Sequence, residues 1–99
     1  MSIRTQFYEL WQFLGAYFTD SHLLGLTDEE VVDGYRSDFN DDESLQKGYD
    51  QTVKEIDLVL QDFERYWKDI GLETNRYFRN SQDAEKWILQ VQKWLKEKR

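Results

Sequence analysis

The chain has 99 residues, a formal net charge of −7 at neutral pH, and neither cysteine nor proline. Its length fits a single domain over residues 1–99, and the lack of cysteine excludes a disulfide framework, a thiol nucleophile and a cysteine-ligated zinc site. Four Trp, six Tyr and six Phe bury large areas each, so a hydrophobic core can form without metals or disulfides.

The negative charge is concentrated in the first half of the chain. Residues 1–45 hold two basic and ten acidic side chains, a balance of −8, whereas residues 46–99 hold eleven basic and ten acidic ones, a balance of +1. Because phosphate groups attract cations, this balance disfavours nucleic acid and membrane surfaces as partners and favours a basic protein. The alternative is an acidic surface that only maintains solubility.

No targeting or membrane segment is expected. No apolar stretch approaches the roughly 20 residues of a membrane span. Glu9 and Gln12 interrupt the apolar start of the chain, which therefore lacks the continuous apolar stretch of a secretory signal. We therefore expect a cytoplasmic protein.

The first predicted helix covers residues 5–17. Its apolar side chains recur at spacings of three and four, which is typical of one helix face; they are Phe7, Leu10, Trp11, Leu14 and Phe18. Gly15 and Ala16, near its end, leave room for the close approach of a neighbouring helix, or Gly15 marks a bend.

A capping box predicts the start of the next helix. The Thr27 hydroxyl is placed to accept from the backbone N–H of Glu30, and the Glu30 carboxylate to accept from that of Thr27. The apolar side chains that follow predict its buried face: Val31, Val32, Tyr35 and Phe39.

A long apolar pattern then extends over residues 43–70. A continuous helix of this length would measure about 42 Å, whereas a compact domain of this size has a radius of gyration of about 13 Å. We therefore expect a break or kink near Gly48 and a C-terminal cap at Gly71.

The closing segment predicts one more helix. Ser81 is placed as its N-cap, and Trp87 and Trp94 lie on its apolar stripe, which favours the core over stacking on nucleic acid. Tyr77 and Phe78 precede it and are expected to pack onto the core. The predicted fold class is all-α, a compact bundle of four to five helices.

The sequence contains no recognisable catalytic or cofactor-binding pattern. His22 is the only histidine and lies in a predicted connection. The acidic run from Asp38 resembles the start of a calcium loop, but Glu43 stands where glycine is needed and Tyr49 where a bidentate glutamate is needed. Phosphate-binding loops and metalloprotease or acyl-enzyme motifs are missing. We therefore expect neither an enzyme nor a bound metal or cofactor.

The segment Leu10–Phe18, with the sequence L-W-Q-F-L-G-A-Y-F, resembles the opening of the contact-dependent growth inhibition immunity proteins. In that family an aromatic run L-x-Q-F-(F/L)-G-(A/G)-Y-F precedes an acidic helix, a long middle helix and a closing segment with W-(I/L). Thr27–Tyr35 lies where the acidic helix is expected, and Trp87-Ile88 and Trp94-Leu95 resemble the closing segment. The chain departs from the family at Thr19–His22, which replaces the common H-Q-D-W.

The resemblance implies an immunity protein that binds and neutralises the C-terminal toxin domain of a contact-dependent growth inhibition effector in the cytosol. Such toxin domains are often nucleases, which present basic sites that an acidic protein can cover. The candidates for toxin contact are the acidic residues of the N-terminal half, with Tyr35 as an anchor: Asp20, Asp28, Glu29, Asp33, Tyr35, Asp38, Asp41, Asp42 and Glu43. For Asp28 and Glu29 the alternative role is helix capping, and for the other acids a solvated face.

The alternative function is a helical adaptor or structural subunit that binds its partner through an exposed aromatic face. Tyr8, Phe13 and Tyr17 lie off the main apolar stripe of the first predicted helix and are the candidates for that face.

Overall fold

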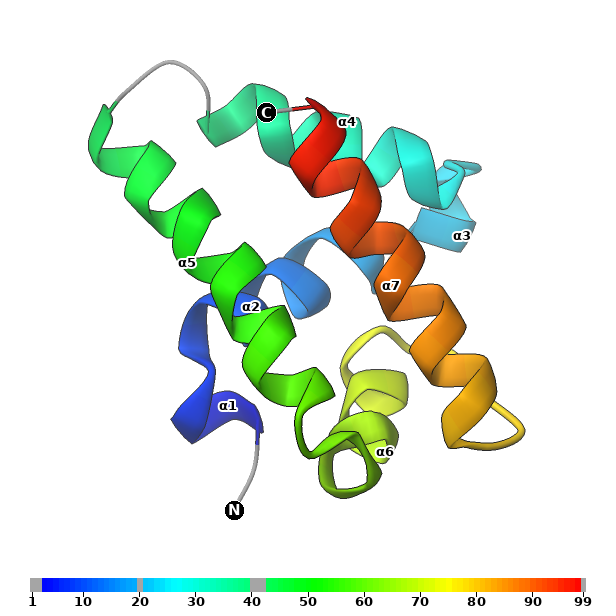
Figure 1. Cartoon of the computed structure of the whole chain (residues 1–99). Coiled ribbons are helices and arrows are strands. Elements are labelled where there is room, and N and C mark those ends of the chain that lie inside the picture. Colours follow the sequence, from blue (N-terminus) through cyan, green and yellow to red (C-terminus); the bar gives the residue numbers. More distant parts are fainter. Residues whose placement is uncertain (1–2, 20, 40–42, 99) are drawn as a thin grey trace.

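The computed structural model describes residues 3–19, 21–39 and 43–98, and these ranges contain helices and no strand (Figure 1). The elements are α1 (Ile3–Gln6), α2 (Tyr8–Phe13), the π-helical turn η1 (Leu14–Phe18), α3 (Ser21–Leu24), α4 (Asp28–Phe39), α5 (Glu43–Leu60), α6 (Phe63–Glu73) and α7 (Ser81–Lys98). The all-α fold class is thus confirmed. No helix in the described ranges is both long enough and apolar enough to cross a lipid bilayer.

The N-terminal helices form the centre of the bundle. α2 packs against α5, η1 packs against α4 and α6, and α7 contacts α4, α5 and α6 (Figure 1). The side chains of Leu10, Leu14 and Phe18, from the first apolar stripe, are fully buried. The assembly is compact, with a radius of gyration of 12.6 Å.

The first predicted helix is divided in the structure. The chain leaves helical geometry at Phe7, so α2 starts afresh and its first N–H groups need new acceptors. The Glu55 carboxylate of α5, only 5% exposed, accepts from the Leu10 N–H at 3.0 Å, and Gln51 donates to its other oxygen at 2.8 Å. A buried acid from a distant helix therefore caps α2.

The predicted capping box of α4 is confirmed. The Thr27 N–H donates to Glu30 Oε1 at 2.9 Å, and the Glu30 N–H donates to the Thr27 hydroxyl at 3.2 Å. Because this cap fixes the helix register, α4 buries Val31, Val32 and Tyr35 as its apolar pattern predicts.

The predicted break near Gly48 is wrong. α5 continues through Gly48, where a Cβ would lie 3.3 Å from the Phe39 ring, so the glycine serves close packing between α4 and α5. The chain turns instead at residues 61–62, where it has neither glycine nor proline.

The prediction that Gly71 caps the end of a helix is also wrong, because the helix continues past it. Gly71 lies inside α6, and Asn75 takes the left-handed conformation with φ 54°. The Arg76 N–H donates to the Gly71 carbonyl at 3.0 Å and the Asn75 N–H to the Leu72 carbonyl at 3.2 Å, the two bonds of a Schellman motif. A Cβ on Gly71 would lie 3.0 Å from the Arg76 carbonyl oxygen, so this turn needs a glycine three residues before the cap.

The N-cap of the final helix is one residue earlier in the chain than predicted. The Asn80 side chain, not that of Ser81, accepts from the Asp83 N–H at 2.9 Å. The Ser81 hydroxyl instead donates to Glu64 of α6 at 2.6 Å. Phe78 packs against the core as expected, but Tyr77 is 86% exposed.

Candidate protein-binding site

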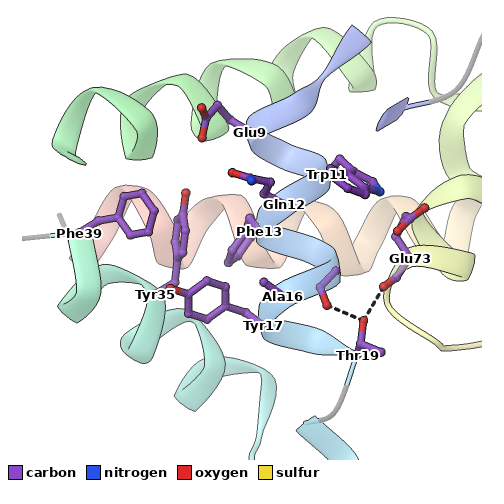
Figure 2. A pocket seen from close by; sticks show the side chains of 11 residues that line it. Glu9, Trp11, Gln12, Phe13, Ala16, Tyr17, Thr19, Tyr35, Phe39 and Glu73 are labelled. Carbon is purple, nitrogen blue, oxygen red and sulfur yellow. Dashed lines mark hydrogen bonds between the residues drawn. The ribbon is translucent and has the colours of Figure 1, made fainter. Parts of the chain in front are cut away.

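A hollow of about 550 Å³ lies along α2 and η1, bordered by α4 and by the end of α6 (Figure 2). We call it the α2–η1 hollow. It is lined by Glu9, Trp11, Gln12, Phe13, Gly15, Ala16, Tyr17, Thr19, Tyr35, Phe39 and Glu73. Its volume is within the range of about 300–1,000 Å³ that is typical of ligand pockets.

Small side chains on η1 create this concavity. Gly15 faces α6 at no more than ordinary contact distance, since a Cβ there would lie 3.6 Å from Glu73 Oε2, so the predicted need for a small residue at this position is not confirmed. The Thr19 hydroxyl fixes this contact because it lies 2.7 Å from the Gly15 carbonyl oxygen and 2.8 Å from that of Glu73 (Figure 2). Ala16 is exposed and faces the open space. A π-helical turn carries an extra residue and frequently occurs at functional sites.

Packed aromatic rings form the α4 side of the hollow. Tyr35 has its ring centroid 4.3 Å from that of Phe13, 4.9 Å from that of Tyr17 and 4.4 Å from that of Phe39. Its hydroxyl shares a hydrogen bond of 2.8 Å with the Thr52 hydroxyl. The proposed surface anchor Tyr35 is therefore a core residue, 2% exposed, and burial raises its pKa. Tyr17 and Phe39, which are half-buried, present aromatic surface instead.

Carboxylates accompany these rings. Glu9 of α2 and Glu73 of α6 line the hollow on different sides of the central helix (Figure 2). Asp38, on the exposed face of α4, accepts from the Tyr17 hydroxyl at 2.7 Å. Burial, and secondly this hydrogen bond, raises the pKa of Tyr17, which therefore remains a neutral donor.

The residues lining the hollow include no basic side chain. Arg4 lies over the ring of Trp11, with its guanidinium carbon 5.1 Å from the ring centroid. A neighbouring depression of about 460 Å³ shares Glu9, Gln12 and Phe39 with the hollow and adds Lys47. The hollow is therefore aromatic and acidic, with cations only beside it.

Asp28, one of the predicted contact residues, is used inside the fold. Arg76 donates two hydrogen bonds to its carboxylate, at 2.8 and 3.1 Å, and Trp87 Nε1 donates a third at 2.9 Å. The guanidinium carbon of Arg76 also lies 4.7 Å from the Trp87 ring centroid and 5.7 Å from that of Phe18. We call these four residues the Asp28 cluster; it joins the start of α4 to the α6–α7 connection and α7.

The remaining predicted contact residues are only partly covered by the structure. Glu29 and Asp33 are exposed on α4, opposite its buried face, and Glu30 lies with them; Asp38 is exposed near the end of α4, about half a turn around the helix from Glu29. Glu29 and Asp33 also interact within the chain. Asp20, Asp41 and Asp42 lie outside the described residues, as does the side chain of Glu43, where α5 begins.

The α2–η1 hollow itself was not predicted as a site. Glu9, Trp11 and Glu73 carried no sequence signal for it. The small pair Gly15–Ala16 was a signal, because small residues on one helix face leave space that a neighbour must fill. Tyr17, which lies off the main apolar stripe, was another.

Comparisons with models of protein families, with curated proteins and with solved structures find no match to this chain. Within the described ranges no three His, Asp or Glu side chains gather as they would around a metal ion. The aromatic and acidic hollow, together with the acidic face of α4, is thus the feature of the described chain best suited to binding another molecule.

Proposed function

We propose that this protein is an immunity protein that binds and neutralises the C-terminal toxin domain of a contact-dependent growth inhibition effector in the cytoplasm. The observation that carries the proposal is the set of exposed carboxylates on α4: Glu29, Glu30 and Asp33 share its solvent face, and Asp38 is exposed at its end, where it accepts a hydrogen bond from Tyr17 of the α2–η1 hollow. The only basic residue of α4, Arg36, is half-buried. The family resemblance of Leu10–Phe18 supports it further, since this segment forms the floor of the hollow.

The charge of α4 suits a basic partner. Carboxylates on one exposed face attract a cationic surface over long range and raise the rate of encounter. Aromatic side chains near the centre of an interface commonly supply much of its binding energy. If the toxin domain is a nuclease, its cationic substrate site is the surface that such an acidic face would cover.

The test is charge reversal on α4, in the double variant Glu29→Lys/Asp33→Lys. With the purified toxin domain of the adjoining effector gene, we expect an association rate about tenfold lower at low salt and a weaker salt dependence. The matched control, Glu85→Lys/Glu97→Lys, makes the same charge change at exposed positions of α7. Equal effects of the two double variants on the association rate would refute a role for the α4 face.

A second candidate function, a helical adaptor, is favoured by a different surface. The expected face of Tyr8, Phe13 and Tyr17 does not form, because Phe13 is 1% exposed. Leu72 and Tyr77, however, are 78% and 86% exposed beside an apolar depression of about 280 Å³. The double variant Leu72→Ser/Tyr77→Ser would disrupt an assembly formed through this face, as measured by sedimentation velocity, and would leave toxin binding through α4 intact.

A further inference from the structure

The Asp28 cluster shows which groups this chain supplies as hydrogen-bond donors to a carboxylate that lies beside aromatic rings. A guanidinium is weakly hydrated, stacks on aromatic faces and offers two parallel N–H donors to one carboxylate. Arg76 does all of this, with Asp28 as the acceptor and the rings of Phe18 and Trp87 beside it. The aromatic rings, the carboxylate and the arginine together form one unit, in which Arg76 Nε is buried and makes no hydrogen bond with the described residues.

The α4 side of the α2–η1 hollow contains the same aromatic and acidic groups. Tyr17 and Phe39 present half-buried rings, and Glu9 supplies a carboxylate; Asp38 lies outside the lining, where it accepts from the Tyr17 hydroxyl. Figure 2 shows the rings of Phe39, Tyr35 and Tyr17 on one side of the central helix. Glu9 lies farther toward the N-terminal end of that helix. Among the described residues no cation lies over Tyr17 or Phe39, whereas Arg4 covers Trp11 on the other side.

We propose that the α4 side of the hollow receives an arginine side chain of the bound protein, which stacks on Phe39 and pairs with Glu9. The inference rests on the proposed function, and it names the partner chemistry that the site accepts. A Cβ on Gly48 would lie 3.3 Å from the Phe39 ring and 3.5 Å from Glu9 Oε2, so this ring and this carboxylate are neighbours. Arginine is favoured over lysine because the ammonium group of lysine is strongly hydrated and cannot stack as a plane.

Neighbouring groups limit where the guanidinium can lie. Lys47 lines the depression beyond Glu9 and repels a second cation there. Asp38 lies outside the lining and already accepts from the Tyr17 hydroxyl, so Glu9 is the carboxylate on the α4 side that faces the arginine. Ala16 is exposed at the mouth of the hollow, so the entering side chain meets no larger group at that position.

The experiment uses a five-residue peptide, acetyl-Ala-Ala-Arg-Ala-Ala-amide, and its twin with citrulline, which has the same shape and no charge. Two-dimensional NMR of the intact protein follows the amides of Ala16, Tyr17 and Phe39. We expect saturable shifts with the arginine peptide and binding at least about fivefold weaker with citrulline. Equal binding of the two peptides, or no shift with either, would overturn the inference.

Variants locate the binding site within the hollow. Glu9→Gln should weaken binding of the arginine peptide about two- to fivefold. Ala16→Leu, which narrows the mouth, should weaken it as well. The matched control is Glu85→Gln, which removes the same charge at an exposed position of α7, outside the hollow, and should leave binding unchanged. An equal loss in Glu85→Gln would mean general attraction to an acidic protein and would reject the site.

The peptide experiment and the toxin experiment fail independently. Binding of the arginine peptide without any binding of the toxin domain would reject the proposed function and retain the chemistry of the hollow. Toxin binding that depends on Glu29 and Asp33 but not on Glu9 would retain the function and reject this inference.

Discussion

The two ends of α4 lie in two regions that have similar side chains but differ in how the carboxylate is paired. At its first turn the carboxylate of Asp28 is paired with Arg76 and surrounded by aromatic rings. At its last turn the carboxylate of Asp38 lies beside the ring of Tyr17 and, among the described residues, is paired only with the neutral hydroxyl of that side chain. The first end is thus a structural joint, whereas the second borders the open hollow that we propose as a binding site. The comparison predicts that substitutions at the first end change stability and those at the second change binding.

The largest effect is expected from Arg76→Met. This change leaves the partly buried Asp28 without its cation, so we expect unfolding free energy to fall by about 3 kcal/mol. Urea unfolding followed by tryptophan fluorescence measures it. The control is Arg79→Met, which breaks the exposed pair with Asp83 and should cost no more than about 0.5 kcal/mol. Equal losses in the two variants would remove the distinction between a structural and a surface arginine.

Asp28→Asn should cost about 2 kcal/mol, less than the loss of the arginine. The amide oxygen still accepts from Trp87 Nε1, but Arg76 loses its charged acceptor. The double variant Arg76→Met/Asp28→Asn should lower the free energy of unfolding by less than the sum of the two single changes, because the two residues act as one unit. Additive losses in urea unfolding would show that Asp28 and Arg76 are not coupled.

At the other end of α4 the effect on stability is small and depends on pH. Folding raises the pKa of Tyr17 and Tyr35 above the ordinary 10.0, mainly by burial. The unfolded chain therefore loses phenol protons first, so the contribution of these two tyrosines to stability is constant below about pH 10 and falls as pH rises above it. Tyr17→Phe should cost about 0.5 kcal/mol at neutral pH and make this fall shallower.

The control for this pH dependence is Tyr77→Phe, since Tyr77 is 86% exposed. Urea unfolding at a series of pH values gives the slope for each variant. A slope that changes as much in Tyr77→Phe as in Tyr17→Phe would show that the environment of Tyr17 is not the cause.

The smallest change in stability is expected from Glu9→Gln and Glu73→Gln, within about 0.5 kcal/mol of the parent protein. Neither carboxylate accepts a hydrogen bond or ion pair from the described residues, so removing its charge breaks no internal contact. Thermal unfolding measures both variants. A loss comparable with that of Asp28→Asn would show that the hollow is also a structural joint.

Local patterns predicted the outline of the fold well. The capping box at Thr27 and Glu30 and the apolar stripes of α4 and α7 depend on neighbours within one helix, so the sequence carries them directly. The division of the first helix was missed because Glu55, which caps α2, lies 45 residues from its acceptor group at Leu10. Gly48 was misread as a break because its role, contact with Phe39, exists only in the tertiary structure.

The site was harder to predict than the fold. Asp28 and Asp38 looked alike in the sequence, and only the positions of Arg76 and Tyr17 separate them. The burial of Tyr35 follows from its place on the apolar face of α4, a pattern that the sequence did contain. The hollow depends on which side of η1 is left uncovered, and no local rule determines that.

The π-helical turn gives this hollow an unusual sensitivity to deletion. Relative to an α-helix, a π turn holds one additional residue within Leu14–Phe18. Removing a single residue there would restore regular winding, and because the π turn takes up its extra residue locally, α2 would keep nearly its present orientation relative to Phe18. Trp11 and Gln12 would still face the hollow, but the segment between them and Phe18 would be one residue shorter. A deletion in this short segment would therefore reshape the wall that η1 forms and leave the two ends of the hollow in place.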